Sequence, residues 1–369
     1  MSAHSTKRIR VLVTDDSTAV KRLLAHALNA QTDLEVAVCA ENRATTLDRI
    51  ALDRPDVVLL DLEAPGADGL DILREIKRRH ADLPVLAFSA QAPHMGKSAA
   101  EALLAGADEH VTKPVSMTPG SSSWNASQGE LALKLRSVTR RSRRRQFDRS
   151  VESVGESVKP GGRGNPPVRA IVIGTSSGGP EALGILLPRL PASLKVPLFI
   201  VQHMPRSFTT ALAGRLNEKS HLRVSEAAHG QVVEPGVAYL AAGDYHLQIS
   251  NRLGKVALML DEGPLENGCR PSVDPLFRSA AEVYGNGLLA VVLTGMGSDG
   301  VEGTRKVADA GGHVWVQDQQ SSAIWGMPGA VVRAGLARRT LGLDAMAEAI
   351  VSALAQGLPL QQASEAKGR

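Results

Sequence analysis

Residues 172–183 read V-I-G-T-S-S-G-G-P-E-A-L, an apolar strand that runs into two serines set between glycines. A strand, a sharp turn and a following helix form the basic unit of an α/β fold. The turn has two chemical uses. A glycine-rich loop at a helix start can hold a phosphate, and a serine exposed there can act as a nucleophile. The choice between them depends on what the rest of the chain brings to this edge of the sheet.

The chain lacks the residues that a phosphate-binding loop usually needs beside its glycines. A dinucleotide-binding fold places an acidic residue about twenty positions after its glycines, where it holds a ribose. Between Glu181 and Glu218 the chain contains no Asp or Glu, and the lysine of a P-loop is missing too. The sequence therefore disfavours a nucleotide site.

A serine nucleophile needs a base and an acid, and a candidate for each follows another apolar strand. Gly174, Ser176 and Gly178 match the pattern G-x-S-x-G. His203 directly follows the strand L-F-I-V-Q, and Asp299 lies in V-V-L-T-G-M-G-S-D-G at 291–300. Because the carboxyl ends of parallel strands share one edge, we expect a Ser176–His203–Asp299 triad.

Two alternatives to this triad stay open. Asp299 could serve only as the N-cap of a helix that starts near Val301. In addition, the chain order serine, acid, histidine of the α/β-hydrolases would pair Asp299 with His313 instead of His203. Triads are recognised by geometry and not by order, which leaves the first assignment permissible.

Alternating strands and helices also fill residues 9–115, with strands expected at 9–13, 56–60, 83–88 and 110–112 and helices at 17–30, 69–79 and 98–105. Polar side chains again follow the predicted strands. These side chains are Asp15, Asp16, Asp61, Ser89 and Lys113. Carboxylates gathered at one end of a sheet repel one another unless a hard cation such as Mg²⁺ holds them. One carboxylate can then accept a phosphoryl group while a lysine neutralises the developing charge. Each of these residues alone could be a helix cap, a turn residue or an ordinary surface residue. The prediction of a phosphorylation site therefore rests on all five occurring in this order at the strand ends.

Residues 116–167 interrupt the α/β alternation. Gly, Pro and Ser cluster at both ends of this segment, and a helix within 130–147 is expected between them. Residues 134–149 carry eight Lys/Arg against one acid, and removing this local charge of +7 from the net charge of +4 leaves about −3 elsewhere. Such a run could contact nucleic acid or an acidic membrane, but a solvated linker helix is the commoner explanation.

The remaining α/β segment runs from Val168 to about Leu358. Strands are expected at 169–173, 197–202, 237–241, 246–250, 256–260 and 288–293. Helices are expected at 180–187, 207–217, 275–284 and 301–310. The close spacing of the strands between 237 and 260 indicates some antiparallel pairing in a mainly parallel sheet.

Composition places the chain among globular proteins. At 369 residues with 43% hydrophobic content, it can build two cores, mostly from aliphatic side chains because aromatics make up only 3%. The two cysteines have no metal or disulfide spacing. Neither a signal peptide nor a membrane-spanning run is recognised, so we expect a cytoplasmic protein with no transmembrane segment.

Residues 9–115 resemble the receiver domains of bacterial response regulators through V-T-D-D-S, D61-L-E-A-P-G-A-D-G69, F-S-A and V-T-K-P. The resemblance implies a doubly wound, five-stranded parallel sheet with Asp61 as phosphoacceptor and Ser89 and Lys113 as switch residues. It implies Mg²⁺ held by Asp16, Asp61 and the Glu63 backbone, with Asp15 acting through water. Two positions depart from the pattern: Ala64 replaces a usual Met, and His110 replaces an aromatic switch residue.

The whole of residues 9–358 resembles one family, the chemotaxis protein-glutamate methylesterases known as CheB. The motifs are I-G-T-S-S-G-G, Q-H-M-P-R-S-F-T, R-P-S-V-D-P-L-F, L-T-G-M-G-S-D-G and W-G-M-P-G-A. The resemblance implies Ser176 as nucleophile, His203 as base and Asp299 as acid. It also implies Ser177 in place of a usual threonine and the Met296 backbone as an oxyanion donor.

This family resemblance implies hydrolysis of glutamyl methyl esters on chemoreceptor cytoplasmic helices and deamidation of receptor glutamines. A chemotaxis histidine kinase would phosphorylate Asp61 and so relieve blockage of the active site by the receiver. We therefore expect a receiver at 1–116, a basic linker at 117–167, a methylesterase domain at 168–360 and a tail at 361–369. We expect a monomer, Mg²⁺ in the receiver and no cofactor in the catalytic domain.

Two rival functions compete with the esterase. Many receivers control DNA-binding output domains, but these are compact and basic, whereas the output domain here is long, α/β and not basic. DNA is therefore not expected as a partner. The second rival is a phosphorylation-controlled binding module that keeps the fold without the chemistry, and the complete Ser/His/Asp set argues against it.

Overall fold

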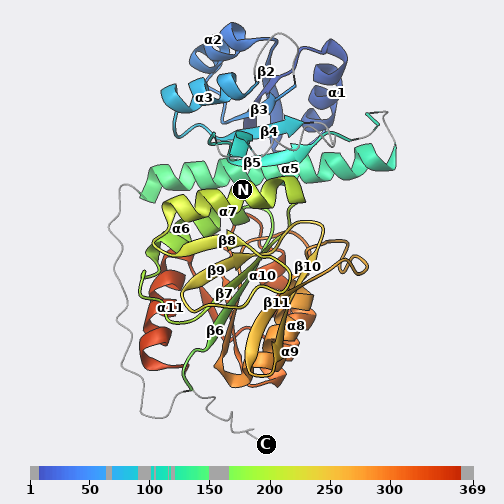
Figure 1. Cartoon of the computed structure of the whole chain (residues 1–369). Coiled ribbons are helices and arrows are strands. Elements are labelled where there is room, and N and C mark those ends of the chain that lie inside the picture. Colours follow the sequence, from blue (N-terminus) through green and yellow to red (C-terminus); the bar gives the residue numbers. More distant parts are fainter. Residues whose placement is uncertain are drawn as a thin grey trace, which may run out of the picture. The chain divides into compact units, whose positions relative to one another are not determined.

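The computed structural model describes residues 8–63, 69–89, 101–103, 105–114, 116–117, 121–148 and 166–358. The chain forms two compact units, residues 1–153 and 154–369. Both are visible in Figure 1, the first in blue to teal and the second in green to red. Within the described ranges, no helix is both long enough and apolar enough to cross a membrane.

The first unit is built on a five-stranded parallel sheet in the order β2-β1-β3-β4-β5, which confirms the predicted sheet. Its strands are β1 (Ile9–Thr14), β2 (Leu34–Ala40), β3 (Val57–Asp61), β4 (Val85–Ser89) and β5 (Glu109–Thr112). Helices α1 (Thr18–Asn29), α2 (Arg43–Asp53) and α3 (Gly69–Arg79) accompany them. The helix expected at 98–105 falls mostly outside the described residues, and β2 and α2 were not among the elements predicted.

The long helix α5 (Ser122–Asp148) contains the helix expected at 130–147 but starts earlier. Trp124, Leu131, Leu135 and Val138 are buried in the core of the first unit together with side chains of β1 and β4. Their spacing puts them on one face of the helix. The first half of the expected linker at 117–167 therefore packs into the core of the first unit. Some side chains of its basic second half lie outside the described residues.

The second unit is built on a seven-stranded sheet in the order β14-β13-β12-β6-β7-β9-β8. All neighbouring pairs in it are parallel. The strands are β6 (Ala170–Thr175), β7 (Leu198–Gln202), β8 (Arg223–Glu226), β9 (Val237–Leu240), β12 (Leu288–Val292), β13 (His313–Gln317) and β14 (Arg339–Leu341). The antiparallel pairing expected between 237 and 260 occurs in a separate hairpin of β10 (His246–Arg252) and β11 (Lys255–Asp261).

Helices cover both faces of this sheet (Figure 1). They are α6 (Gly179–Leu186), α7 (Arg206–Lys219), α8 (Val273–Tyr284), α9 (Val301–Asp309), α10 (Met327–Arg333) and α11 (Leu343–Gln356), with short 3₁₀ turns at Leu187–Arg189 and Gly285–Gly287. Alternate residues of β6 enter different cores: Ile171 and Ile173 pack toward α6, α7 and α11, whereas Ala170 and Val172 pack toward α8, α9 and α10. Burial on both faces explains why these strands are continuously apolar.

The order of the strands reverses at the centre of the sheet. From β6 the chain moves outward through β7 to the β9–β8 edge, then returns to β12 on the other side of β6. At such a switch point the loops after adjacent strands diverge, and ligands of doubly wound sheets bind there. The turns that carry Ser176, His203 and Asp299 all leave the sheet at this edge.

Candidate active site and candidate phosphorylation site

The turn that carries Ser176 is fixed by its own backbone. The Ser176 N–H donates to the Thr294 carbonyl at 3.0 Å, and the Gly179 N–H donates back to the Ser176 carbonyl at 2.8 Å. Gly178, with φ +78°, is the N-cap of α6. A Cβ on Gly179 would lie 1.9 Å from Gln202 Oε1. Only glycine lets the helix start approach β7 this closely, which explains the second half of the S-S-G-G motif.

Gln202 joins the serine turn to the strand that carries the base. Its Nε2 donates to the carbonyl of Ser176 at 2.9 Å and to the carbonyl of His203 at 3.1 Å. The residue is 2% exposed, and its Oε1 has no hydrogen-bond partner among the described groups. Gln202 was not among the predicted site residues, although it stands directly before His203 at a strand end.

His203 and Asp299 form the central pair of the site. The His203 Nε2 and the Asp299 Oδ2 are 2.6 Å apart, and Cys269 Sγ lies 3.6 Å from His203 Nδ1. Burial disfavours the imidazolium, but the hydrogen bond that His203 donates to Asp299 and the contact with Cys269 outweigh burial and raise the pKa of His203 to about 9. Because Nε2 is engaged by Asp299, Nδ1 is the nitrogen that can accept a proton from a nucleophile.

The Ser176 hydroxyl lies at the same sheet edge, but within the described ranges it makes no hydrogen bond to His203. The structure thus brings the predicted base and acid into direct contact and supplies the predicted nucleophile beside them. Catalytic hydrogen bonds are often long before substrate binds. Ser177 Oγ has no hydrogen bond to a described residue either, while the Ser177 carbonyl accepts from Thr294 Oγ1 at 2.9 Å.

Asp299 is held by the start of a helix that is not its own. It accepts from the N–H groups of Val273 at 2.7 Å and Asp274 at 3.3 Å, both in the first turn of α8. Ser272 Oγ donates to it at 2.8 Å. Burial raises the pKa of Asp299, but the contact with His203 and these hydrogen bonds lower it below its ordinary value. A carboxylate at this helix end also meets the positive end of the α8 dipole.

The two alternatives for Asp299 do not fit this geometry. The N-cap of α9 is Gly300 without a side-chain cap, so Asp299 is not an ordinary cap of the following helix. His313 is the first residue of β13, at the opposite end of the sheet, and its Nε2 contacts Arg338 at 2.7 Å. Burial and the Arg338 charge lower the pKa of His313 to about 4, which is typical of a structural neutral histidine.

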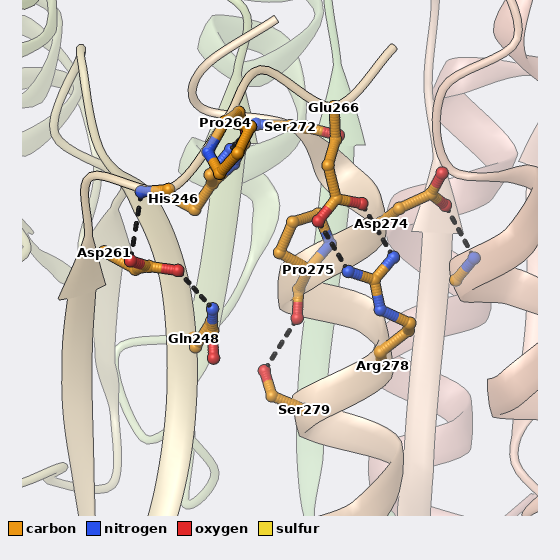
Figure 2. Close-up of polar contacts among 12 residues, drawn as sticks. His246, Gln248, Asp261, Pro264, Glu266, Ser272, Asp274, Pro275, Arg278 and Ser279 are labelled. Carbon is orange, nitrogen blue, oxygen red and sulfur yellow. Dashed lines mark hydrogen bonds and ion pairs between the residues drawn. The ribbon is translucent and has the colours of Figure 1, made fainter.

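The loop before α8 supplies contacts that sequence reasoning missed. Asn267 donates to Asp299 Oδ1 at 2.8 Å, and Ser272 and Cys269 contribute the bonds given above. Figure 2 shows Ser272 and Asp274 at the start of α8, with Arg278 one turn further on and joined to Glu266. The motif R-P-S-V-D was recognised as a whole. The Asn-Gly pair before it is a turn signal that could have marked the loop.

The predicted oxyanion donor Met296 and the neighbouring Ser177 lie in the loops after β12 and β6. Met296 follows Gly295 in the loop after β12 and is 43% exposed. The N–H groups of Ser177 and Met296 donate to no other group in the described part of the chain. Backbone N–H groups that are unused at a helix start and in a glycine turn are the kind of donor that holds a developing oxyanion.

In the first unit, the residues predicted to bind a cation are gathered at the carboxyl end of the sheet. One carboxylate oxygen each of Asp15, Asp16 and Asp61 lies within 4.8 Å of the others. Asp15 and Asp61 are buried, and Asp15 Oδ2 has no hydrogen-bond partner among the described residues. Burial, with the charge of Asp61, raises the pKa of Asp15 to about 6. An orphaned buried carboxylate oxygen in an all-oxygen set fits a hard divalent cation.

The predicted switch residues surround this acidic cluster. Lys113 Nζ is 2.7 Å from Asp61 Oδ2, and the Glu63 N–H donates to Asp61 Oδ1 at 3.0 Å. Ser89 Oγ lies 2.9 Å from His110 Nε2, so the histidine at the unusual position pairs with the switch serine. Burial and the charge of Lys134 lower the pKa of His110 to about 4. Ala64 lies outside the described residues.

Family models match both units. Residues 171–350 match the CheB methylesterase family, and residues 11–119 match the response regulator receiver domain. A protein-glutamate methylesterase/protein-glutamine glutaminase of Nocardioides sp. is 40% identical over 95% of this chain and 97% of its own length. One with the same name from Trichodesmium erythraeum is 38% identical over 93% and 98%. The crystal structure of the Thermotoga maritima CheB methylesterase catalytic domain is 42% identical, covering 50% of this chain and 97% of that one, with a TM-score of 0.49.

Proposed function

The chain belongs to the CheB family of protein-glutamate methylesterases/protein-glutamine glutaminases, and we propose that Ser176, His203 and Asp299 carry out its hydrolysis. The protein removes methyl groups from glutamate methyl esters of chemoreceptors and converts receptor glutamines to glutamates, under the control of its receiver domain. The observation that supports the residue assignment best is the 2.6 Å contact of His203 and Asp299 at the edge where the Ser176 turn leaves the sheet.

The triad accounts for both reactions in the same steps. Ser176 Oγ attacks the side-chain carbonyl carbon while His203 Nδ1 accepts the serine proton, and Asp299 stabilises the imidazolium. The N–H groups of Met296 and Ser177 hold the developing oxyanion. The leaving methoxide or amide takes the proton from His203 and departs as methanol or ammonia. Water, deprotonated by His203, then hydrolyses the acyl-enzyme, and Ser176 regains its proton.

In the receiver, Asp61 is the proposed phosphoacceptor. Asp16, Asp61 and the Glu63 carbonyl would hold Mg²⁺, with Asp15 acting through water. These residues would hold Mg²⁺, which when bound would supply positive charge to offset that of the phosphoryl group. Lys113, already 2.7 Å from Asp61, contributes a second positive charge. Ser89 gives its hydroxyl to the phosphorylated state, which requires it to leave His110.

The partners follow from the same activity. The substrate is presented by the cytoplasmic helices of methyl-accepting chemoreceptors, and the phosphodonor is a chemotaxis histidine kinase. We place the protein in the cytoplasm, acting as a monomer without DNA and without a cofactor in its catalytic domain.

Methanol release from a methylated receptor cytoplasmic fragment tests both halves of the assignment. Wild type, Ser176→Ala and Asp61→Asn are compared with and without a small-molecule phosphodonor and Mg²⁺. We expect Ser176→Ala to lose at least about 10³-fold in rate, because the nucleophile is absent. Asp61→Asn should keep the basal rate and lose the response to phosphodonor. Turnover that survives Ser176→Ala would overturn the nucleophile, and a phosphodonor response in Asp61→Asn would overturn the phosphoacceptor.

A further inference from the structure

A tight turn at residues 266–269, E-N-G-C, approaches the acid of the triad from the solvent side. The Glu266 N–H donates to the Cys269 carbonyl at 3.2 Å, and the Cys269 N–H donates to the Glu266 carbonyl at 2.9 Å. Between them, Asn267 and Gly268 have φ angles of +52° and +74°. Positive φ at both central residues defines a type I′ turn, for which Asn-Gly is the preferred pair. The turn is therefore locally well specified.

Three side-chain contacts attach this turn to the catalytic centre. Glu266 is bound by both guanidinium nitrogens of Arg278 on α8, at 2.7 and 2.9 Å (Figure 2). Cys269 Sγ lies 3.6 Å from His203 Nδ1. Between these two contacts, the Asn267 side chain reaches inward to a pair of carboxylates. Each of the three polar residues of the turn thus has a partner on α8 or in the proposed triad.

The carboxylates that Asn267 contacts are Asp299 and a second one, Asp274, in the first turn of α8. Asn267 Nδ2 is 2.8 Å from Asp299 Oδ1 and 2.8 Å from Asp274 Oδ2. The two acids are 2% and 4% exposed. Burial and the charge of Asp299 raise the pKa of Asp274, while hydrogen bonds from Gly303 N–H and Asn267 oppose that rise. Two buried carboxylates side by side repel each other, and the amide supplies one N–H to each.

We propose that Asn267 is a positioning residue, which keeps the Asp299 carboxylate on His203 by bridging and separating it from the second buried carboxylate, Asp274. This inference rests on the proposed function of Ser176, His203 and Asp299. Without the amide, the N–H groups that bridge Asp299 Oδ1 and Asp274 Oδ2 are lost and no longer offset the repulsion between the two carboxylates. Rotation of Asp299 away from Asp274 relieves that repulsion but disturbs the 2.6 Å contact between Oδ2 and His203 Nε2.

Two substitutions separate the amide from the backbone of the turn. Asn267→Gly keeps the left-handed conformation and removes the side chain, whereas Asn267→Ala removes the side chain and also strains the backbone. If the amide positions Asp299, both variants lose kcat by about 10- to 100-fold with KM nearly unchanged, a range typical of small misplacements of catalytic groups. If only the turn conformation matters, Asn267→Gly keeps the wild-type kcat, and the proposal is overturned.

A double variant tests the separation of the carboxylates. Asp274→Asn keeps an oxygen that can accept from the Gly303 N–H but removes the charge that repels Asp299. We expect Asn267→Gly combined with Asp274→Asn to recover part of the kcat that Asn267→Gly loses. A double variant no faster than Asn267→Gly would contradict the proposal, because repulsion by Asp274 would not be the cause of the loss.

A spectroscopic readout makes the test independent of turnover. The proton in the short His203–Asp299 hydrogen bond should give a far-downfield ¹H NMR signal in the full-length protein, identified by its loss in His203→Gln. In a Ser176→Ala background, which leaves this pair intact, adding Asn267→Gly should move or abolish the signal. An unchanged signal would overturn the positioning role. Activity retained by Ser176→Ala alone would instead overturn the proposed function, so the two failures are distinguishable.

Discussion

The imidazole of His203 has a partner at each ring nitrogen, and both partners favour its protonated form. Asp299 contacts Nε2 and Cys269 contacts Nδ1, and together they overcome the burial that would otherwise favour the neutral ring. A general base must be neutral before it can accept a proton, so a raised pKa moves the active form to higher pH. The Cys269 thiol also occupies the side of the ring that must serve the nucleophile.

Replacing Cys269 by alanine should therefore change the pH dependence of the enzyme. Loss of the sulfur contact lowers the pKa of His203, because one interaction that stabilises the imidazolium is gone. The acid limb of kcat/KM should move to lower pH, and the rate at pH 7 should rise about two- to tenfold for a pKa change of up to about one unit. Methanol release between pH 6 and 10 measures the limb.

Cys39→Ala is the matched control for this experiment, since Cys39 is the other free thiol and lies on β2 of the first unit. Its profile should match wild type. An acid limb that stays in place, or moves to higher pH, in Cys269→Ala would contradict the assigned effect of the thiol on His203.

At this scale the sequence predicted residues at strand ends and missed those that act through long-range contacts. Ser176, His203 and Asp299 each follow an apolar strand, so parallel topology alone brings them to one edge. Gln202 and Asn267 act through hydrogen bonds that include partners 26 and 32 positions away. Such bonds depend on loop conformation in three dimensions, which residue spacing does not encode.

At the starts of helices α8 and α9, a carboxylate of each helix region accepts hydrogen bonds from N–H groups of the other helix. Asp299, just before α9, accepts from the first N–H groups of α8, and Asp274, near the start of α8, accepts from the Gly303 N–H in the first turn of α9 at 2.6 Å. Each helix thereby satisfies N–H groups of the other that have no partner within their own helix. The proposed acid of the triad is consequently positioned by the packing of two whole helices.

The substitution Gly303→Ala tests this packing. A Cβ there would lie 2.6 Å from Phe277 Cβ and 3.0 Å from Asp274 Oδ1, so α9 must move away from α8. We expect a loss of about 1–3 kcal/mol in the free energy of unfolding, typical of an overpacked core, together with a lower kcat as Asp274 and Asp299 shift. Thermal or denaturant unfolding and methanol release measure the two effects.

The matched control is Gly214→Ala, in the middle of α7, where an added Cβ meets no atom within 4 Å. Removing a glycine from an open helix position should stabilise by up to about 1 kcal/mol and leave kcat unchanged. Equal stability changes in the two variants would show that helix propensity, and not contact between α8 and α9, governs position 303.

Among whole elements, several apolar strands were predicted, but others were missed, including the fully buried strand β13 and helix α11 with its buried face. The strands β6, β7 and β12 are continuous apolar runs, and the sequence analysis expected each of them. By contrast, β8, β13, β14, α10 and α11 were absent from the expected elements. Helix α5 was assigned to a linker because its many charged residues obscure the apolar face of Trp124, Leu131 and Leu135. That face packs against the sheet of the first unit, a contact that the sequence of the helix alone does not reveal.

At the scale of the whole molecule, the sheet and the hydrophobic cores of the second unit are formed by its own residues. The seven-stranded sheet lies within residues 170–341, and both of its cores are formed by side chains of residues 168–358. The Leu358 N–H donates to the Pro166 carbonyl at 2.9 Å, which joins the two ends of the described part of this unit. A fragment of residues 166–369 should therefore fold without the receiver.

Such a fragment tests how the receiver controls the catalytic domain. If the unphosphorylated receiver restrains the site, residues 166–369 should release methanol faster than unphosphorylated full-length protein, by about fivefold or more for a coupling of at least 1 kcal/mol. Phosphodonor with Mg²⁺ should bring the full-length rate toward that of the fragment, and Asp61→Asn should remain slow. Ser176→Ala in the fragment controls for hydrolysis that does not use the site. Equal rates for the fragment and the unphosphorylated chain would contradict restraint, and phosphorylation would then have to act by raising the activity of the catalytic domain above its isolated value.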